Sequence, residues 1–213
     1  MTPVRFDRLK KVLCLGAHSD DIEIGCGGTL LRLIQENPDL QVYWFVFNAT
    51  GVRVREARQS ARDYLKGTRS PKIRIGRFQE SYFPSHWPAI KDAFEEVKRQ
   101  FDPDLVLTHF REDRHQDHRV LSDLAWNTFR NHLVLEYEIP KYDGDLGAPN
   151  IFFPFSRQIG ERKVAALLRH FKSQSSRQWF TADTFWALMR LRGIECASPG
   201  GFAEAFHGRK FVL

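Results

Sequence analysis

The chain has 213 residues, of which 42% are hydrophobic and 27% charged, and this composition excludes global disorder and suits one folded domain. The net charge of +6 is dispersed, with no run of five or six basic residues, so we expect no nucleic-acid partner. No window approaches about 18 apolar residues, and charged residues within 5–11 leave no apolar signal segment, so we expect a cytoplasmic protein without a membrane span.

Segments of strand and helix character alternate through the first 140 residues. Continuous apolar runs such as VLCL at 12–15 predict buried strands, and apolar residues on one stripe, such as Ile90, Phe94 and Val97, predict helices. The predicted elements are strand 11–17, helix 29–36, strand 42–48, helix 53–66, strand 72–78, helix 89–101, strand 105–110, helix 122–132 and strand 133–139. This rhythm predicts an α/β fold with a mostly parallel sheet and helices on both faces.

The rhythm loosens after residue 140. A loop containing Gly, Asp and Pro is expected at 141–150, and the end at 203–212 is expected to return to the sheet or to form a hairpin. Between them we expect a strand at 150–155 and helices at 161–171 and 181–192. With no linker or repeat, we predict a single domain over 1–213, with a core at 11–140 that 141–213 completes.

The three cysteines are Cys14, Cys26 and Cys196. They form no CxxC pair, and their number is odd, so neither a disulfide framework nor a cysteine zinc cluster is expected.

Polar clusters follow the first and fourth predicted strands. The first cluster is His18-Ser19-Asp20-Asp21, and the second begins at His109 and continues to His118 (HFREDRHQDH). Ligands of an open parallel sheet bind beyond the carboxyl ends of its strands, so both clusters are expected at one edge. Imidazoles and carboxylates are the ligands that zinc and related divalent ions prefer.

His18, Asp21 and His118 can supply three ligands, which leaves one position open for water, as in catalytic zinc sites. Asp20 would then be free to act as general base. His115, with Asp117 beside it, can stabilise an oxyanion or protonate a leaving group. The alternative for the Asp pair is a helix N-cap, and the alternative for RHQDHR is a hydrophilic surface loop.

Two motifs resemble those of a known family. AHSDDIEIGCGGTL resembles the AHPDDxExGCGGTL signature of the PIG-L/LmbE-like N-deacetylases, and HQDH matches their second motif, HxDH. The resemblance implies a Rossmann-like fold and zinc, or another divalent metal such as Fe²⁺. It implies His18, Asp21 and His118 as metal ligands, with Asp20 as general base and His115, oriented by Asp117, as electrostatic partner.

Other matches are weaker. Arg53 and Glu56 match an Arg-x-x-Glu pattern of the family, in which Arg53 would contact the sugar; the alternative is a solvated helix face. Ser19 replaces the usual proline, and Glu23 stands one position later than in many members. HFKSQ and GGFAEAF are loose matches in the last third, and His207, which follows the second of them, is expected to be structural.

The expected activity is metal-assisted amide hydrolysis that removes acetyl from an N-acetylated, GlcNAc-type amino sugar, a small molecule that is free or linked to a nucleotide, lipid or glycan. One alternative is an esterase or phosphohydrolase at the same site, using arginines such as Arg53, Arg111, Arg114 and Arg119 to bind phosphate. The other is a non-catalytic sugar-binding protein. A homo-oligomer is left open.

Overall fold

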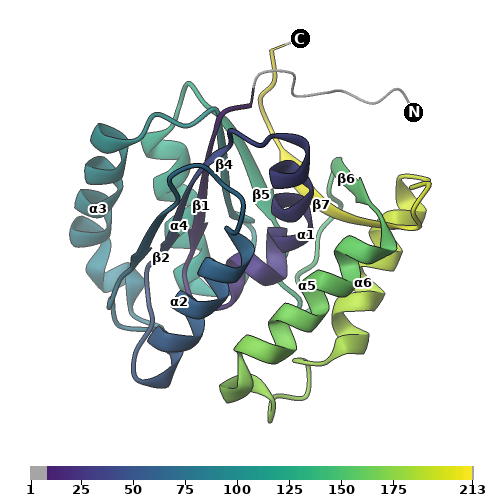
Figure 1. The fold of residues 1–213 in the computed structure, drawn as a ribbon. Helices are drawn as coiled ribbons and strands as arrows, with labels where there is room; N and C mark the ends of the chain where they lie inside the picture. Colours follow the sequence, from purple (N-terminus) through teal and green to yellow (C-terminus); the bar gives the residue numbers. More distant parts are fainter. Residues whose placement is uncertain (1–8, 213) are drawn as a thin grey trace.

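The computed structural model describes residues 9–212. Residues 5–8 of the charged segment 5–11, from which no apolar signal segment is expected, therefore lie outside the described part. Strands and helices alternate along the chain (Figure 1). They are β1 (Lys11–Gly16), α1 (Asp21–Glu36), β2 (Gln41–Val46), α2 (Val52–Tyr64), β3 (Lys72–Ile75), η1 (Phe83–His86), α3 (Trp87–Gln100), β4 (Leu105–His109), α4 (Gln116–Thr128), β5 (Leu133–Tyr137), β6 (Ile151–Phe155), α5 (Arg157–His170), η2 (Lys172–Gln174), α6 (Ala182–Glu195) and β7 (Phe202–Gly208).

The strands form one seven-stranded sheet in the order β3-β2-β1-β4-β5-β7-β6. The first five strands are mutually parallel, and β7 pairs antiparallel with both β5 and β6. The predicted mostly parallel α/β sheet is confirmed, and the end of the chain returns to the sheet.

Two hydrophobic clusters cover the two faces of the sheet. One joins the strands to α1, α2, α5 and α6, and the other joins them to α3 and α4 (Figure 1). The continuous apolar strands need this double cover, because side chains alternate between the two faces. β1 illustrates it, since Val12 and Cys14 belong to one cluster and Leu13 and Leu15 to the other.

Two predicted helices begin earlier than the sequence pattern indicates, and both differences lie at the polar clusters. α1 starts at Asp21 instead of residue 29 and has a break at Cys26. α4 starts at Gln116 instead of residue 122, so the HQDH motif is the first turn of a helix and not a loop. The smaller differences are shifts of element ends by up to about four residues, as expected for boundaries read from sequence.

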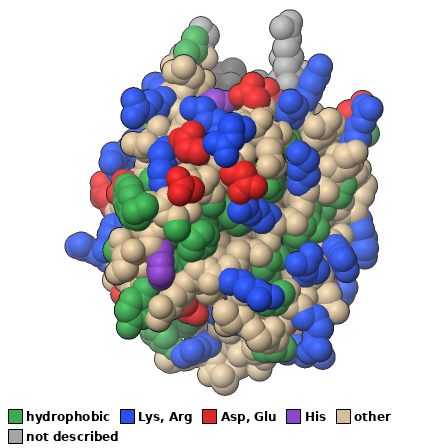
Figure 2. Space-filling view, turned by 90° about the vertical axis from the view of Figure 1, so that its left-hand side faces the viewer, with side chains coloured by type: hydrophobic (Ala, Val, Ile, Leu, Met, Phe, Trp, Pro, Cys, Tyr) green, Lys and Arg blue, Asp and Glu red, His purple; other side chains and the backbone are tan. Residues whose placement is uncertain are grey.

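Charge is dispersed on the face shown in Figure 2, where Lys and Arg side chains are interrupted by acidic and hydrophobic ones. Within residues 9–212, no helix has the length and apolar character needed to cross a membrane. The three cysteines are free thiols.

Candidate active site

The candidate site lies where the strand order reverses. β1 and β4 are adjacent and parallel, with Val12 opposite Leu105 and Cys14 opposite Leu107, although 92 residues separate Ala17 and His109 at their ends. The chain leaves β1 toward β2 on one side and leaves β4 toward β5 on the other. Loops at such a switch point diverge and leave a crevice between them. Both polar clusters are therefore at the same edge, as predicted.

Three predicted ligand atoms form a compact triangle. His18 Nδ1 is 3.4 Å from Asp21 Oδ2 and 3.2 Å from His118 Nε2, and His118 Nε2 is 3.6 Å from Asp21 Oδ2. A tetrahedral zinc ion with ligand distances of about 2.0–2.1 Å separates its ligand atoms by about 3.3 Å. The spacing of these three atoms thus fits zinc, and the donor set is one that zinc accepts.

The triangle is part of a larger cluster of imidazoles. Two further groupings have the spacing to hold a metal ion, His18 with His115 and His118, and Asp21 with His109 and His118. His109 is fully buried, its ring stacks on His118 at 3.9 Å, and its Nε2 lies 2.9 Å from the backbone nitrogen of Ala17. His109 Nε2 can accept the Ala17 N–H, and a nitrogen that does so has no lone pair left for a metal ion. His109 therefore packs behind Asp21, whose Oδ2 is 3.2 Å from the same nitrogen.

Both predicted histidine ligands have a carboxylate at the other ring nitrogen. His18 Nε2 lies 3.2 Å from Asp117 Oδ2, and His118 Nδ1 lies 2.9 Å from Asp113 Oδ2. Such contacts fix the tautomer and orientation of an imidazole that binds metal. Asp113 is not among the residues predicted from the sequence, where its position five residues before His118 in the HFREDRHQDH run is the one indication of a role.

The carboxylates are themselves held in place. Asp117 accepts hydrogen bonds from the backbone N–H groups of Ser81 at 2.6 Å and Phe83 at 3.1 Å, and Asp113 accepts from Lys141 Nζ at 2.9 Å. Burial opposes ionisation, but His118 and Lys141 lower the pKa of Asp113, while His18 and the two N–H groups lower the pKa of Asp117. Both side chains are therefore ionised at neutral pH.

The metal-free cluster is electrostatically uneven. Burial lowers the pKa of His18, but the carboxylates of Asp21 and Asp117 outweigh it and raise this pKa to about 10. Burial and the neighbouring His109 lower the pKa of His118 to about 3. Burial opposes ionisation of Asp21, yet His118, His109 and His18 hold its pKa well below the usual range. The site therefore places ionised carboxylates beside buried imidazoles, a setting in which a bound cation competes with a proton.

Asp20 is buried but is not used as a helix cap. It occupies the N-cap position of α1, and its side chain makes no capping hydrogen bond. Its Oδ1 accepts from Arg53 Nη2 at 2.7 Å, and its Oδ2 has no partner within residues 9–212. Burial raises the pKa of Asp20 to about 6, against the opposing effect of Arg53. A carboxylate with this pKa and a free oxygen can accept a proton near neutral pH.

His115 is the N-cap residue of α4, and its Nδ1 accepts the backbone N–H of Asp117 at 3.2 Å. Its ring stacks on His118 at 4.6 Å and meets the ring of His18 edge-on at 4.7 Å. Asp117 thus reaches His115 through its backbone, whereas its carboxylate contacts His18. Burial and His18 lower the pKa of His115, so the ring is neutral at pH 7.

Arg53, Glu23 and His207 have distinct surroundings. Arg53, in the first turn of α2, contacts Asp20. Glu23 is fully buried, burial raises its pKa well above the usual range, and both of its carboxyl oxygens are without a hydrogen-bond partner within the described residues. His207 stacks on Phe110 at 3.7 Å, in keeping with the structural role expected of it.

Comparisons with known proteins identify the family of the chain. The family model described as GlcNAc-PI de-N-acetylase (PIG-L) matches residues 13–129, more than half of the chain and both polar clusters. The chain belongs to the PIG-L family. The match includes every residue of the predicted metal and acid–base cluster, and the protein is an N-deacetylase.

Individual relatives extend the comparison. An uncharacterised deacetylase, YaiS, from Escherichia coli is 28% identical over 173 residues, covering 77% of this chain and 92% of its own length. N,N'-diacetylchitobiose deacetylase from Pyrococcus horikoshii has a similar structure, with a TM-score of 0.71, 21% identity, and coverage of 96% of this chain and 85% of its own.

A Pseudomonas putida enzyme, the 4-carboxy-2-hydroxymuconate hydratase GalB, also has a similar structure, with a TM-score of 0.73, 15% identity, and coverage of 96% of this chain and 98% of its own. Proteins of this fold therefore include a deacetylase and a hydratase, so the reaction depends on the residues of the site and not on the fold.

Proposed function

We propose that the protein is a zinc-dependent deacetylase that hydrolyses the acetamide of an N-acetylated, GlcNAc-type amino sugar. The observation that carries the proposal is the triangle of His18, Asp21 and His118, with a buried, partly unpaired Asp20 beside it. A zinc ion held by these ligands supplies Lewis-acid polarisation and lowers the pKa of water to about 7.

Asp20 takes a proton from the attacking water at Oδ2, the oxygen that has no protein partner. Arg53 holds Oδ1 at 2.7 Å, which fixes the direction of the carboxylate and favours its ionised form. In this arrangement Arg53 acts on the base, and contact with the sugar would use its remaining donors.

His115 supplies a proton donor for the oxygen of the acetamide. Since Nδ1 accepts the Asp117 N–H, the proton of the neutral ring is on Nε2. Nε2 has no partner in the described part of the chain, so it is free to stabilise the developing oxyanion. Asp20, once protonated, returns its proton to the leaving amine.

A phosphohydrolase is less well supported, because two of the four nominated arginines, Arg53 and Arg119, are engaged in contacts within the protein. Arg53 pairs with Asp20, and Arg119 donates to the carbonyl oxygens of Asp113 and Arg114. Arg111 lies 3.8 Å from Asp123 on the surface.

The test is release of free amine from a panel of N-acetylated sugars, free, nucleotide-linked and lipid-linked, with zinc, with Fe²⁺ and after chelation. We expect stoichiometric amine and acetate, lost on chelation and restored by metal. Metal-independent turnover, or phosphate release without amine release, would contradict the proposal. A cytoplasmic location and the oligomeric state stay predictions.

A further inference from the structure

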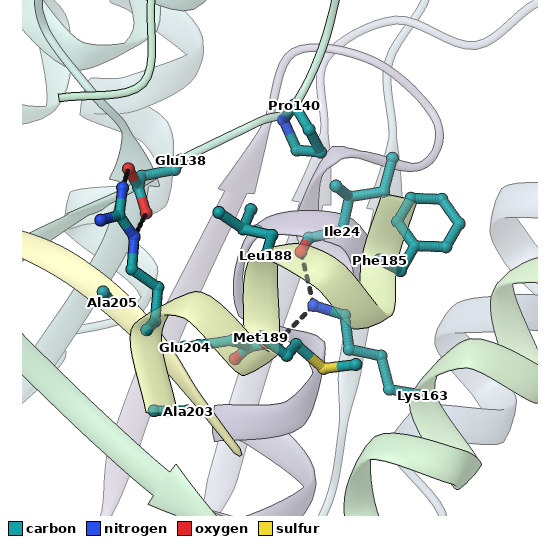
Figure 3. Close-up of a pocket in the computed structure, with 12 residues that line it drawn as sticks. Ile24, Glu138, Pro140, Lys163, Phe185, Leu188, Met189, Ala203, Glu204 and Ala205 are labelled. Carbon is teal, nitrogen blue, oxygen red and sulfur yellow. Dashed lines mark hydrogen bonds and ion pairs between the residues drawn. The ribbon is translucent and has the colours of Figure 1, made fainter. Parts of the chain in front are cut away.

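Helix α1 is broken at Cys26, whose φ of −142° and ψ of 15° lie outside the helical range. A break frees carbonyl groups on one side and N–H groups on the other, and such groups are costly when buried without partners. Two charged side chains from distant elements fill this break, Lys163 of α5 and Glu204 of β7 (Figure 3).

The cation binds the carbonyl side of the break, and the anion binds its N–H side. Lys163 Nζ donates to the carbonyl oxygen of Ile24 at 2.6 Å, on the side nearer the active site. Glu204 accepts from the N–H groups of Gly28 and Thr29 at 2.8 and 2.7 Å, on the far side. A cation at helix carbonyls and an anion at helix N–H groups both match the helix dipole. The two side chains also pair at 2.5 Å.

This pair is buried and leaves no room for a ligand. The Lys163 and Glu204 side chains are 3% and 5% exposed, and the adjacent cavity holds only about 10 Å³. That volume admits one water molecule at most. The approach is close enough to require glycine at position 28, where a Cβ would lie 2.7 Å from the Phe155 ring and 3.1 Å from Glu204 Oε1. The pair therefore acts on the helix and not on a bound molecule.

A short path leads from Lys163 to the predicted base and metal ligand. Ile24, held through its carbonyl by Lys163, donates its N–H to the carbonyl oxygen of Asp20 at 3.0 Å. Asp21 begins the same short helical segment, which ends at the break. Because the break uncouples this segment from the rest of α1, its orientation depends on contacts from outside the helix.

We propose that Lys163 and Glu204 are positioning residues, which fix the first turn of α1 so that Asp20 and Asp21 meet His18 and His118 in metal-binding geometry. The inference rests on the proposed function, since it assigns these residues to the same metal site. It also gives a role to one of the two loosely matching segments of the last third, because Glu204 lies in GGFAEAF.

The test is the double variant Lys163→Met/Glu204→Gln, which removes both charges and keeps an acceptor oxygen for the helix N–H groups. Its matched control is Glu138→Gln/Arg192→Met. That pair is equally buried, at 3% and 6% exposed, and lines the same cavity. Within the described residues, its hydrogen bonds join the two side chains to each other and Arg192 to Glu195 and Gly147, and none reaches α1. Zn²⁺ affinity is measured by competition with a chromophoric chelator, together with melting temperature, kcat and KM.

We expect both double variants to melt cooperatively. Lys163→Met/Glu204→Gln should bind Zn²⁺ about 10–100-fold more weakly and lose kcat with little change in KM, whereas the control keeps wild-type Zn²⁺ affinity. Wild-type affinity and kcat in Lys163→Met/Glu204→Gln, or an equal loss of affinity in the control, would overturn the inference.

If Lys163→Met/Glu204→Gln fails to fold, Lys163→Arg, which keeps a cation beside the buried Glu204 but replaces the ammonium group at the Ile24 carbonyl, is measured with the same two outcomes. Failure of the proposed function is distinguishable, since the wild-type protein would then bind no Zn²⁺ or release no amine.

Discussion

Replacing Asp20 with asparagine removes the proton acceptor and little else. Asparagine has the same shape, and its Oδ1 can still accept from Arg53, which lies 2.7 Å from Oδ1 of Asp20. The three predicted ligand atoms belong to other residues, so metal binding should survive. General-base catalysis contributes about 10²–10⁴-fold, so kcat should fall by that factor, equivalent to about 3–5 kcal/mol of transition-state stabilisation.

The assay measures amine release at saturating substrate alongside zinc content per chain. Asp123→Asn is the control, because Asp123 is exposed on α4 and lies 3.8 Å from Arg111, away from the three predicted ligands. It should leave both quantities unchanged. A rate for Asp20→Asn within about tenfold of wild type would refute the base assignment, and loss of zinc together with activity would show that Asp20 is itself a ligand.

Three further predictions concern the surroundings of the site and the fold. Asp113→Ala removes the carboxylate at His118 Nδ1, and Zn²⁺ affinity measured by chelator competition should fall about 10–100-fold; unchanged affinity would remove Asp113 from the site. Gly25→Ala places a Cβ 2.1 Å from the buried Tyr137 ring, whose hydroxyl is held by Leu15 O, so the free energy of unfolding should fall by at least about 1–3 kcal/mol, and a wild-type denaturation midpoint would contradict this. Hydrogen bonds from His170 and Lys66 lower the pKa of Asp63 to about 2; this stabilisation is complete above the unfolded pKa of about 4 and is lost as the pH falls toward 2. Urea unfolding of metal-free Asp63→Asn should therefore show a deficit of up to about 1 kcal/mol at neutral pH that vanishes near pH 2, and a pH-independent deficit would contradict the linkage.

The order of elements and the edge of the sheet that carries the site could be predicted from sequence. The buried strands of the parallel sheet are continuous apolar runs. The turns that follow them are marked by polar residues close by in the sequence. His18 and His118 could be paired because the carboxyl ends of parallel strands share an edge. That inference requires only that β1 and β4 run in the same direction.

The start of α1 could not be predicted in the same way. GCGG is a poor helix sequence, so the pattern places the helix after it, at residue 29. The first turn, from Asp21 to Gly25, ends at a break whose Ile24 carbonyl is satisfied by Lys163, 139 residues away. A contact of that sequence separation leaves no periodic signal in a single chain.

Outer partners of the histidines were only partly predictable. Asp117 was expected to orient His115, and the structure places its carboxylate against His18, because the first turn of α4 directs that side chain toward β1 and toward the N–H groups of Ser81 and Phe83. The start of α4 at Gln116 could not be predicted, because the charged sequence RHQDHR is equally typical of a surface loop.

The central claim is that His18, Asp21 and His118 together hold one catalytic divalent ion. Diffraction data collected on either side of the zinc absorption edge, from crystals grown with zinc, test it directly. We expect a single anomalous peak within about 2.0–2.2 Å of His18 Nδ1, Asp21 Oδ2 and His118 Nε2. A peak coordinated by His109 or Asp20 instead, or no peak between β1 and β4 at saturating zinc, would contradict it.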